Sequence, residues 1–188
     1  GRIWPLDEFQ ATVDAAHERG LIAHLDGARL FNAAVGAGLP PSEWARRADS
    51  VTVCFSKGLG CPIGAALAGS AELIERAWQG KYLLGGALRQ SGVIAAAALF
   101  ALDHNVDRLA EDHARAARLA EALGLESETN FVAVPDPAGD LEARARERGV
   151  LLGDLRPGWL RAVTHLDISD ADIDEAIEVI PELAGVHA

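Results

Sequence analysis

The stretch SVTVCFSKGLG, residues 50–60, joins a strand-like run to a glycine-rich turn that carries a lysine. Residues 50–55 are β-branched or apolar for the most part, which predicts a strand. Lys57 follows the predicted strand, and the glycines at positions 58 and 60 let a ligand approach the backbone. It is one of only two lysines among 17 basic residues. A lysine amine can form a Schiff base with an aldehyde, so the stretch indicates either a nucleophile or a phosphate-binding or surface lysine.

A second strand-like run, residues 21–26, ends in the charged residue Asp26. Helical apolar spacing at residues 6–19 precedes it, and a third apolar run follows at residues 63–68. Strands that alternate with helices predict an α/β architecture with a mostly parallel sheet. Such sheets bind ligands at the carboxyl ends of their strands. Asp26 and Lys57 both stand at predicted strand ends, so we expect them to share a site.

The remainder of the chain predicts one further helix of this first domain and then a smaller domain. The Ala-rich residues 91–104 predict a helix that is buried on most faces. Beyond Asn105 the pattern is that of a small α+β domain. Its expected elements are helices at 108–123, 141–148 and 173–183 and strands at 130–134, 150–152 and 159–164. We therefore expect a domain boundary between residues 1–104 and 105–188.

Composition narrows the classes of function. The net charge of −11 argues against nucleic-acid and anionic-membrane surfaces, and no apolar run predicts a membrane span or a signal peptide. The two cysteines, Cys54 and Cys61, flank Lys57, and so few cysteines are typical of a protein in the reducing cytoplasm. They lack the Cys-x-x-Cys spacing of a metal site, so no bound metal is expected. The sequence has no Met and starts with a turn and a helix, so we expect it to be part of a longer protein.

Four motifs, in order, resemble those of the L-threonine aldolases of the low-specificity type, which are β-eliminating lyases of the fold-type-I pyridoxal phosphate group. HLDGAR at 24–29 is similar to their His-x-Asp-Gly-Ala-Arg motif, and VCFSKGLGCPIG at 53–64 to their lysine loop. GGALRQSG at 85–92 and LRAVTHLD at 160–167 resemble two further segments. The resemblance implies a partial large cofactor-binding domain at 1–104, mostly parallel sheet with helices, and a small C-terminal domain at 105–188.

The resemblance also implies pyridoxal 5'-phosphate as the cofactor and an amino acid as the substrate. It implies these roles: Lys57 as the Schiff-base lysine, Asp26 at the pyridine nitrogen, Arg29 beside the phenolic oxygen and the substrate, Ser56 and Arg89 near the phosphate, and Arg161 on the substrate carboxylate. Arg89 would reach across a dimer interface, so the full-length parent is expected to be a homodimer or homotetramer. His24 and His165 are expected to be structural, and the catalytic base and phosphate loop are not assigned in this chain.

The implied reaction is retro-aldol cleavage of L-threonine or L-allo-threonine to glycine and acetaldehyde. Family members carry a further N-terminal segment before these motifs, and we expect activity to require it. Two alternatives stay open. One is another pyridoxal phosphate lyase of the same fold, acting by β-elimination or on a related 3-hydroxy amino acid. The other is a non-catalytic fragment that keeps the lysine side of the site.

Overall fold

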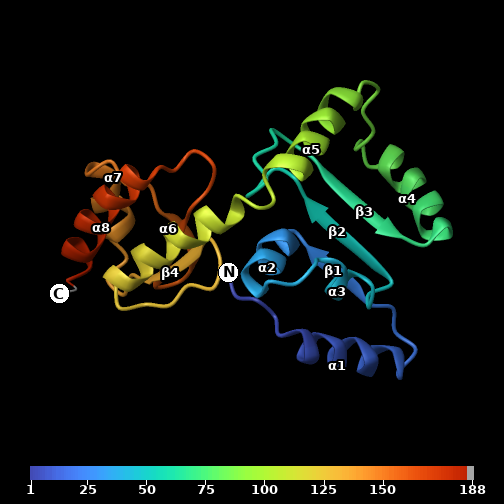
Figure 1. Cartoon of the computed structure of the whole chain (residues 1–188), viewed down its shortest axis with the longest axis horizontal. Coiled ribbons are helices and arrows are strands. Elements are labelled where there is room, and N and C mark those ends of the chain that lie inside the picture. The colour runs from blue at the N-terminus through green and yellow to red at the C-terminus, as the bar shows by residue number, and fades with distance from the viewer. Residues whose placement is uncertain (186–188) are drawn as a thin grey trace. The chain divides into compact units, whose positions relative to one another are not determined.

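The computed structural model describes residues 1–185, and the chain divides into two compact units. The N-terminal unit is Trp4–Asp107, and the C-terminal unit is Gly1–Ile3 together with the residues from Arg108 onward. Figure 1 follows the elements along the chain in colour. The division falls in the connection between helices α5 and α6, as does the expected boundary at 104/105. The assignment of a cofactor-binding role to one domain stays a prediction.

A three-stranded sheet lies at the centre of the N-terminal unit, in the order β1-β2-β3 (Figure 1). Its strands are β1 (His24–Gly27), β2 (Ser50–Cys54) and β3 (Ala65–Gly69). β1 and β2 are parallel, whereas β3 pairs with β2 in the antiparallel sense. A parallel connection needs a long crossover, usually a helix, and none lies between β2 and β3. The expected α/β class is confirmed, with one parallel and one antiparallel pairing in this sheet.

Five helices of the N-terminal unit surround this sheet within the described residues. They are α1 (Leu6–His17), α2 (Leu30–Ala37), α3 (Ser42–Ala45), α4 (Ala71–Leu83) and α5 (Gly92–His104). The Ser70 side chain accepts a hydrogen bond from the Leu73 N–H, so Ser70 caps α4. Among residues 1–185, none of the helices combines the length and apolar character that crossing a lipid bilayer requires.

Two expectations for this unit are wrong. β1 begins at His24 rather than at residue 21, because its pairing with β2 starts there, and Ile22 is 78% exposed in the connection. Helix α5 is not buried on most faces: Ala98 and Ala101 are its buried residues, whereas Val93 is 78% exposed. The Ala-rich sequence is apolar all round, so it carries no periodic signal to say which side would be covered.

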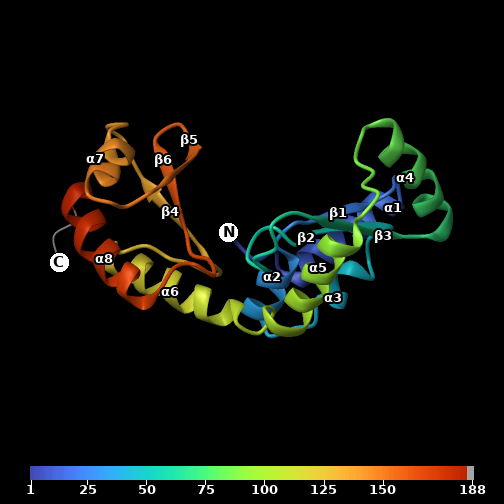
Figure 2. The same ribbon diagram turned by 90° about the horizontal axis from the view of Figure 1, so that it is seen from above.

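The C-terminal unit is an antiparallel sheet packed against helices. β4 (Phe131–Pro135), β6 (Trp159–Val163) and β5 (Gly153–Arg156) lie in the order β4-β6-β5, with β6 in the middle. The helices are α6 (Leu109–Ala122), α7 (Leu141–Glu147) and α8 (Asp170–Ala184). Figure 2 shows α6 and α8 side by side along the sheet. The expected strand at 150–152 is wrong, since β5 begins only at Gly153, where pairing with β6 begins.

One face of this sheet forms the core of the unit. Val132 and Val134 of β4 and Leu160 of β6 are buried there with Ile180 of α8. Alternate residues of a strand point to opposite faces, so Ala133 and Arg161 lie on the other face. Arg161 is exposed.

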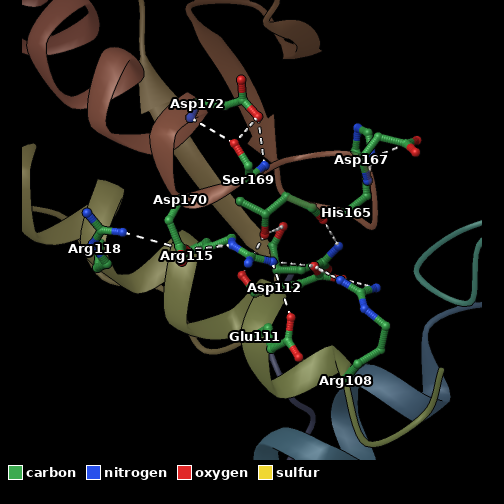
Figure 3. Close-up of polar contacts among 12 residues, drawn as sticks. Arg108, Glu111, Asp112, Arg115, Arg118, His165, Asp167, Ser169, Asp170 and Asp172 are labelled. Atoms are coloured by element: carbon green, nitrogen blue, oxygen red, sulfur yellow. Dashed lines mark hydrogen bonds and ion pairs between the residues drawn. The ribbon is translucent and has the colours of Figure 1, made fainter. Parts of the chain in front are cut away.

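A buried polar network anchors the end of β6 to the start of α6 (Figure 3). Asp112 is fully buried and accepts two hydrogen bonds, of 2.7 and 3.3 Å, from the Arg108 guanidinium. The Thr164 hydroxyl donates to the Asp112 carbonyl at 2.6 Å, and the Asn130 amide donates to the Thr164 carbonyl at 2.7 Å. Because Thr164 directly follows β6, the network fixes the strand that carries Arg161.

Candidate active site

Asp26 and Lys57 lie at the same edge of the N-terminal sheet. Asp26 is on β1, directly opposite Thr52 of β2, and Lys57 follows the end of β2. The carboxyl ends of two neighbouring parallel strands meet at one edge of a sheet, so both residues stand where α/β proteins bind ligands. Both are exposed. This placement agrees with the expectation from the sequence that Asp26 and Lys57 stand at neighbouring strand ends, and their roles stay a prediction.

The loop that carries Lys57 is held closed by its own backbone. The Phe55 N–H donates to the Gly64 carbonyl at 2.9 Å, and the Cys61 N–H donates back to the Phe55 carbonyl at 3.0 Å. Within the loop, the Gly60 N–H donates to the Lys57 carbonyl at 2.9 Å. Gly60 has φ of +74°, a conformation that favours glycine. Lys57 therefore projects from a turn whose backbone is fixed at both ends.

Asn105 is a support of this loop that sequence reasoning missed. Its amide Nδ2 donates to the Leu59 carbonyl at 2.7 Å, across 46 positions of the sequence. Leu59 is itself only 2% exposed, so the loop is anchored inward beside the lysine. No local pattern could have indicated Asn105, because the bond joins the residue after α5 to a loop far along the chain.

The two cysteines beside Lys57 differ in burial, because Cys61 is buried and Cys54 is half-buried. The Cys61 thiol is buried and lies 3.5 Å from the Ala97 carbonyl. Burial raises the pKa of the Cys61 thiol, and the nearby Cys54 raises it further. A thiol with a raised pKa is a poor nucleophile. Cys54 Sγ lies 3.2 Å from the Ser56 hydroxyl, which follows it at the end of β2. Lys57 is thus the strongest nucleophile candidate of the loop.

The Asp26 carboxylate is oriented from its own turn. The Ala28 N–H donates to Asp26 Oδ1 at 3.1 Å. His24, on the same face of β1, is held by hydroxyls of β2: its Nδ1 lies 2.8 Å from Ser50 Oγ and its Nε2 lies 3.3 Å from Thr52 Oγ1. His24 is exposed but hydrogen-bonded to the neighbouring strand in this structure.

Gly27 has no room for a side chain. A Cβ atom there would lie 2.8 Å from the Thr52 carbonyl oxygen and 3.2 Å from Leu30 Cβ. We expect Gly27→Ala to lower the free energy of unfolding by about 1–3 kcal/mol, because the backbone of β2 has to move. Chemical denaturation would measure it, with Gly80→Ala as the matched control, since a Cβ there meets nothing within 4 Å. Equal stability of the two variants would contradict this reading.

Arg29 and Arg89, the two candidate arginines of the N-terminal unit, are placed differently. Arg29 is half-buried and directly precedes α2, so it lies one turn past Asp26. Arg89 is exposed in the turn between α4 and α5. Within residues 1–185, no hydrogen bond or ion pair joins Arg89 to Ser56 or to Lys57. The structure therefore brings Asp26, Ser56 and Lys57 to one sheet edge, whereas Arg89 belongs to the turn between α4 and α5.

Arg161 belongs to the C-terminal unit and differs from the other arginines of that unit. Arg156 lies over the Trp159 ring, with Cζ 4.8 Å from the ring centroid. The arginines of this unit that pair with carboxylates are Arg2, Arg108, Arg115, Arg118, Arg144, Arg146 and Arg148. In the described part of the unit, Arg161 is the one arginine with neither kind of partner. A guanidinium without a counter-ion is available to bind an anion.

Comparison with known proteins gives the family. The family model for beta-eliminating lyases matches residues 1–134, well over half of the chain. The chain belongs to the beta-eliminating lyase family. The matched region contains the lysine loop and the Asp26 turn, which the sequence resemblance had singled out.

The chain is also similar to curated relatives in bacteria and plants. It is 39% identical to the low specificity L-threonine aldolase of Escherichia coli over 93% of this chain and 55% of that protein. It is 37% identical to low-specificity L-threonine aldolase 1 of Arabidopsis thaliana, over 92% of this chain and 52% of that protein. The chain thus spans about half the length of these relatives.

Solved structures share the fold. A Leishmania major threonine aldolase matches 96% of this chain and 57% of its own, with a TM-score of 0.75 at 20% identity. A Sphingomonas wittichii serine palmitoyltransferase matches 96% of this chain with a TM-score of 0.66, also at 20% identity. Two proteins named for different reactions share this fold, so the reaction has to be argued from the site residues.

Proposed function

We propose that this chain is the lysine-bearing part of a pyridoxal-phosphate-dependent threonine aldolase. The observation that carries the proposal is the placement of Asp26 and Lys57 at the carboxyl ends of two neighbouring parallel strands. The low-specificity threonine aldolases at 37–39% identity support it. The whole enzyme would cleave L-threonine or L-allo-threonine to glycine and acetaldehyde.

The residues at this edge fit pyridoxal 5'-phosphate. An aldehyde needs an accessible amine, and Lys57 is exposed, with no hydrogen bond or ion pair to its ammonium in the described chain. A pyridinium nitrogen needs a carboxylate oxygen, and Asp26 keeps Oδ2 free while Oδ1 accepts the Ala28 N–H. When bound, the cofactor supplies an electron sink for bond cleavage at the α-carbon of an amino acid.

Each candidate residue has a role that follows from its chemistry. Lys57 would hold the cofactor aldehyde covalently, and its amine would then be exchanged for the amine of the substrate. The Asp26 carboxylate would keep the pyridine nitrogen protonated, because an anion beside that nitrogen favours its charged form. The Ser56 hydroxyl would donate to the phosphate. Arg161 would bind the substrate carboxylate through two parallel hydrogen bonds, which fixes the orientation of the bond to be broken.

The remaining assignments extend this proposal. Arg29 would lie beside the phenolic oxygen of the cofactor and the substrate, because it follows Asp26 by one turn. Arg89 would reach the phosphate of a neighbouring subunit, as the family resemblance implies, and within residues 1–185 no hydrogen bond or ion pair joins it to Ser56. We therefore propose a homodimer or homotetramer for the complete protein, located in the cytoplasm. Turnover would also require residues beyond this chain, because neither a catalytic base nor a phosphate loop is assigned in it.

Product analysis tests the reaction. We expect the complete polypeptide that carries this chain to convert L-threonine to glycine and acetaldehyde in equal amounts, because breaking the Cα–Cβ bond releases both. Amino acid chromatography and aldehyde trapping would measure them. Release of ammonia and a keto acid instead would favour β-elimination, the second candidate, which the family match leaves open. Release of neither set of products would support the non-catalytic alternative.

A further inference from the structure

Arg161 is flanked across the C-terminal sheet by two residues that are almost without side chains. It stands opposite Ala133 of β4 on one side and opposite Gly153 of β5 on the other. Residues that pair in register present their side chains on the same face of a sheet. Ala133 and Gly153 therefore leave open space on both sides of the Arg161 side chain on this face of the sheet.

The Arg161 side chain lies across Gly153. A Cβ atom on Gly153 would have three nearest neighbours, all from Arg161: Nε at 3.1 Å, Cγ at 3.6 Å and Nη2 at 3.8 Å. Cδ and Cζ, the two carbons bonded to Nε, lie farther away than these three atoms. A point that is 3.1 Å from Nε but more than 3.8 Å from both of its bonded carbons lies on the side of the Nε hydrogen. The Nε–H edge of Arg161 therefore rests against β5.

This placement decides which edge of the guanidinium is available. A guanidinium can bind a carboxylate through a side edge, formed by Nε and Nη2, or through its end, formed by Nη1 and Nη2. The side edge faces Gly153, where the backbone of β5 already lies. The end is the edge that remains open to a carboxylate.

We propose that Gly153 is a positioning residue for Arg161, which lets the guanidinium lie against β5 and present its Nη1–Nη2 end to the substrate carboxylate. The proposal rests on the carboxylate-binding role of Arg161 proposed above. A side chain at position 153 would push Nε off the strand and turn the end of the guanidinium. Even a methyl group would move Nε by a few tenths of an ångström, because its carbon would lie 3.1 Å from Nε.

Nuclear magnetic resonance of the arginine side chains tests this on the complete polypeptide that carries this chain, with L-threonine as the titrant. We expect L-threonine to shift the Nη signals of Arg161 and to leave its Nε signal almost unchanged. Gly153→Ala should weaken the apparent affinity about tenfold, which is the scale of a misplacement well below 1 Å. Gly80→Ala is the matched control, because a Cβ there meets nothing within 4 Å, and it should bind L-threonine as the parent chain does.

The outcomes separate this inference from the proposed function. Arg161→Lys identifies the Arg161 signals and should abolish the response. If no Arg161 signal moves in the complete parent polypeptide, the carboxylate-binding role itself is wrong. If the Nε signal moves as far as the Nη signals and Gly153→Ala keeps full affinity, Arg161 binds the carboxylate but Gly153 does not position it. A backbone amide spectrum of Gly153→Ala that matches the parent chain excludes misfolding as the cause of weak binding.

Discussion

Lys57→Ala is expected to abolish covalent attachment of pyridoxal phosphate to the chain and to reduce threonine cleavage by the complete protein to background. An alanine methyl cannot form a bond with the cofactor aldehyde, and no other amine projects from the loop between β2 and β3. Borohydride reduction makes the lysine–cofactor bond permanent, so peptide mass spectrometry would locate it. The peptide that contains residue 57 should carry the modification in the parent chain and lose it in the variant.

Lys81 provides the matched control, because it is the second of the two lysines of this chain. Its ammonium lies 4.8 Å from the centre of the Trp78 ring on α4, so it is engaged in a cation–π contact outside the loop. Lys81→Ala should leave the modification of Lys57 unchanged. Equal labelling of both lysines in the parent chain, or labelling that persists in Lys57→Ala, would contradict the assignment of Lys57.

The features that sequence predicts well here are those that depend on neighbouring residues. The Ser70 cap and the capping box of Ser169 and Asp172 each involve residues three positions apart, so such caps can be recognised from a local pattern. The placement of Asp26 and Lys57 follows from two local motifs once β1 and β2 are known to be parallel neighbours. The family resemblance then supplied the chemistry for those motifs.

The features that sequence could not predict depend on contacts between distant segments. The burial of α5 is set by what packs against it, and an Ala-rich helix gives no periodic signal. Asn105 supports the lysine loop through a bond to Leu59. The pairing of Gly153 with Arg161 could not be predicted either, because the apolar pattern at 150–152 places the start of β5 three residues too early.

Asp112→Ala should cause the largest loss of stability in the C-terminal unit, on the order of 3–5 kcal/mol in the free energy of unfolding. Asp112 is fully buried, and Arg108, which donates two hydrogen bonds to it, has a side chain only 15% exposed. Removing the carboxylate leaves the Arg108 charge in a poorly hydrated place. Denaturation followed through the indole signal of Trp159, which lies on β6 of this unit, would measure the change.

The exposed pair Asp140–Arg144 is the matched control, since it has the same spacing along a helix. Asp140→Ala should change stability little, because water and salt screen an exposed ion pair. Asp112→Asn then separates charge from shape. The Thr164 hydroxyl donates to the backbone carbonyl of residue 112, so both variants at this position retain that bond. If the lost charge is the cause, Asp112→Asn should be nearly as unstable as Asp112→Ala, whereas near-parent stability of Asp112→Asn would assign the effect to packing.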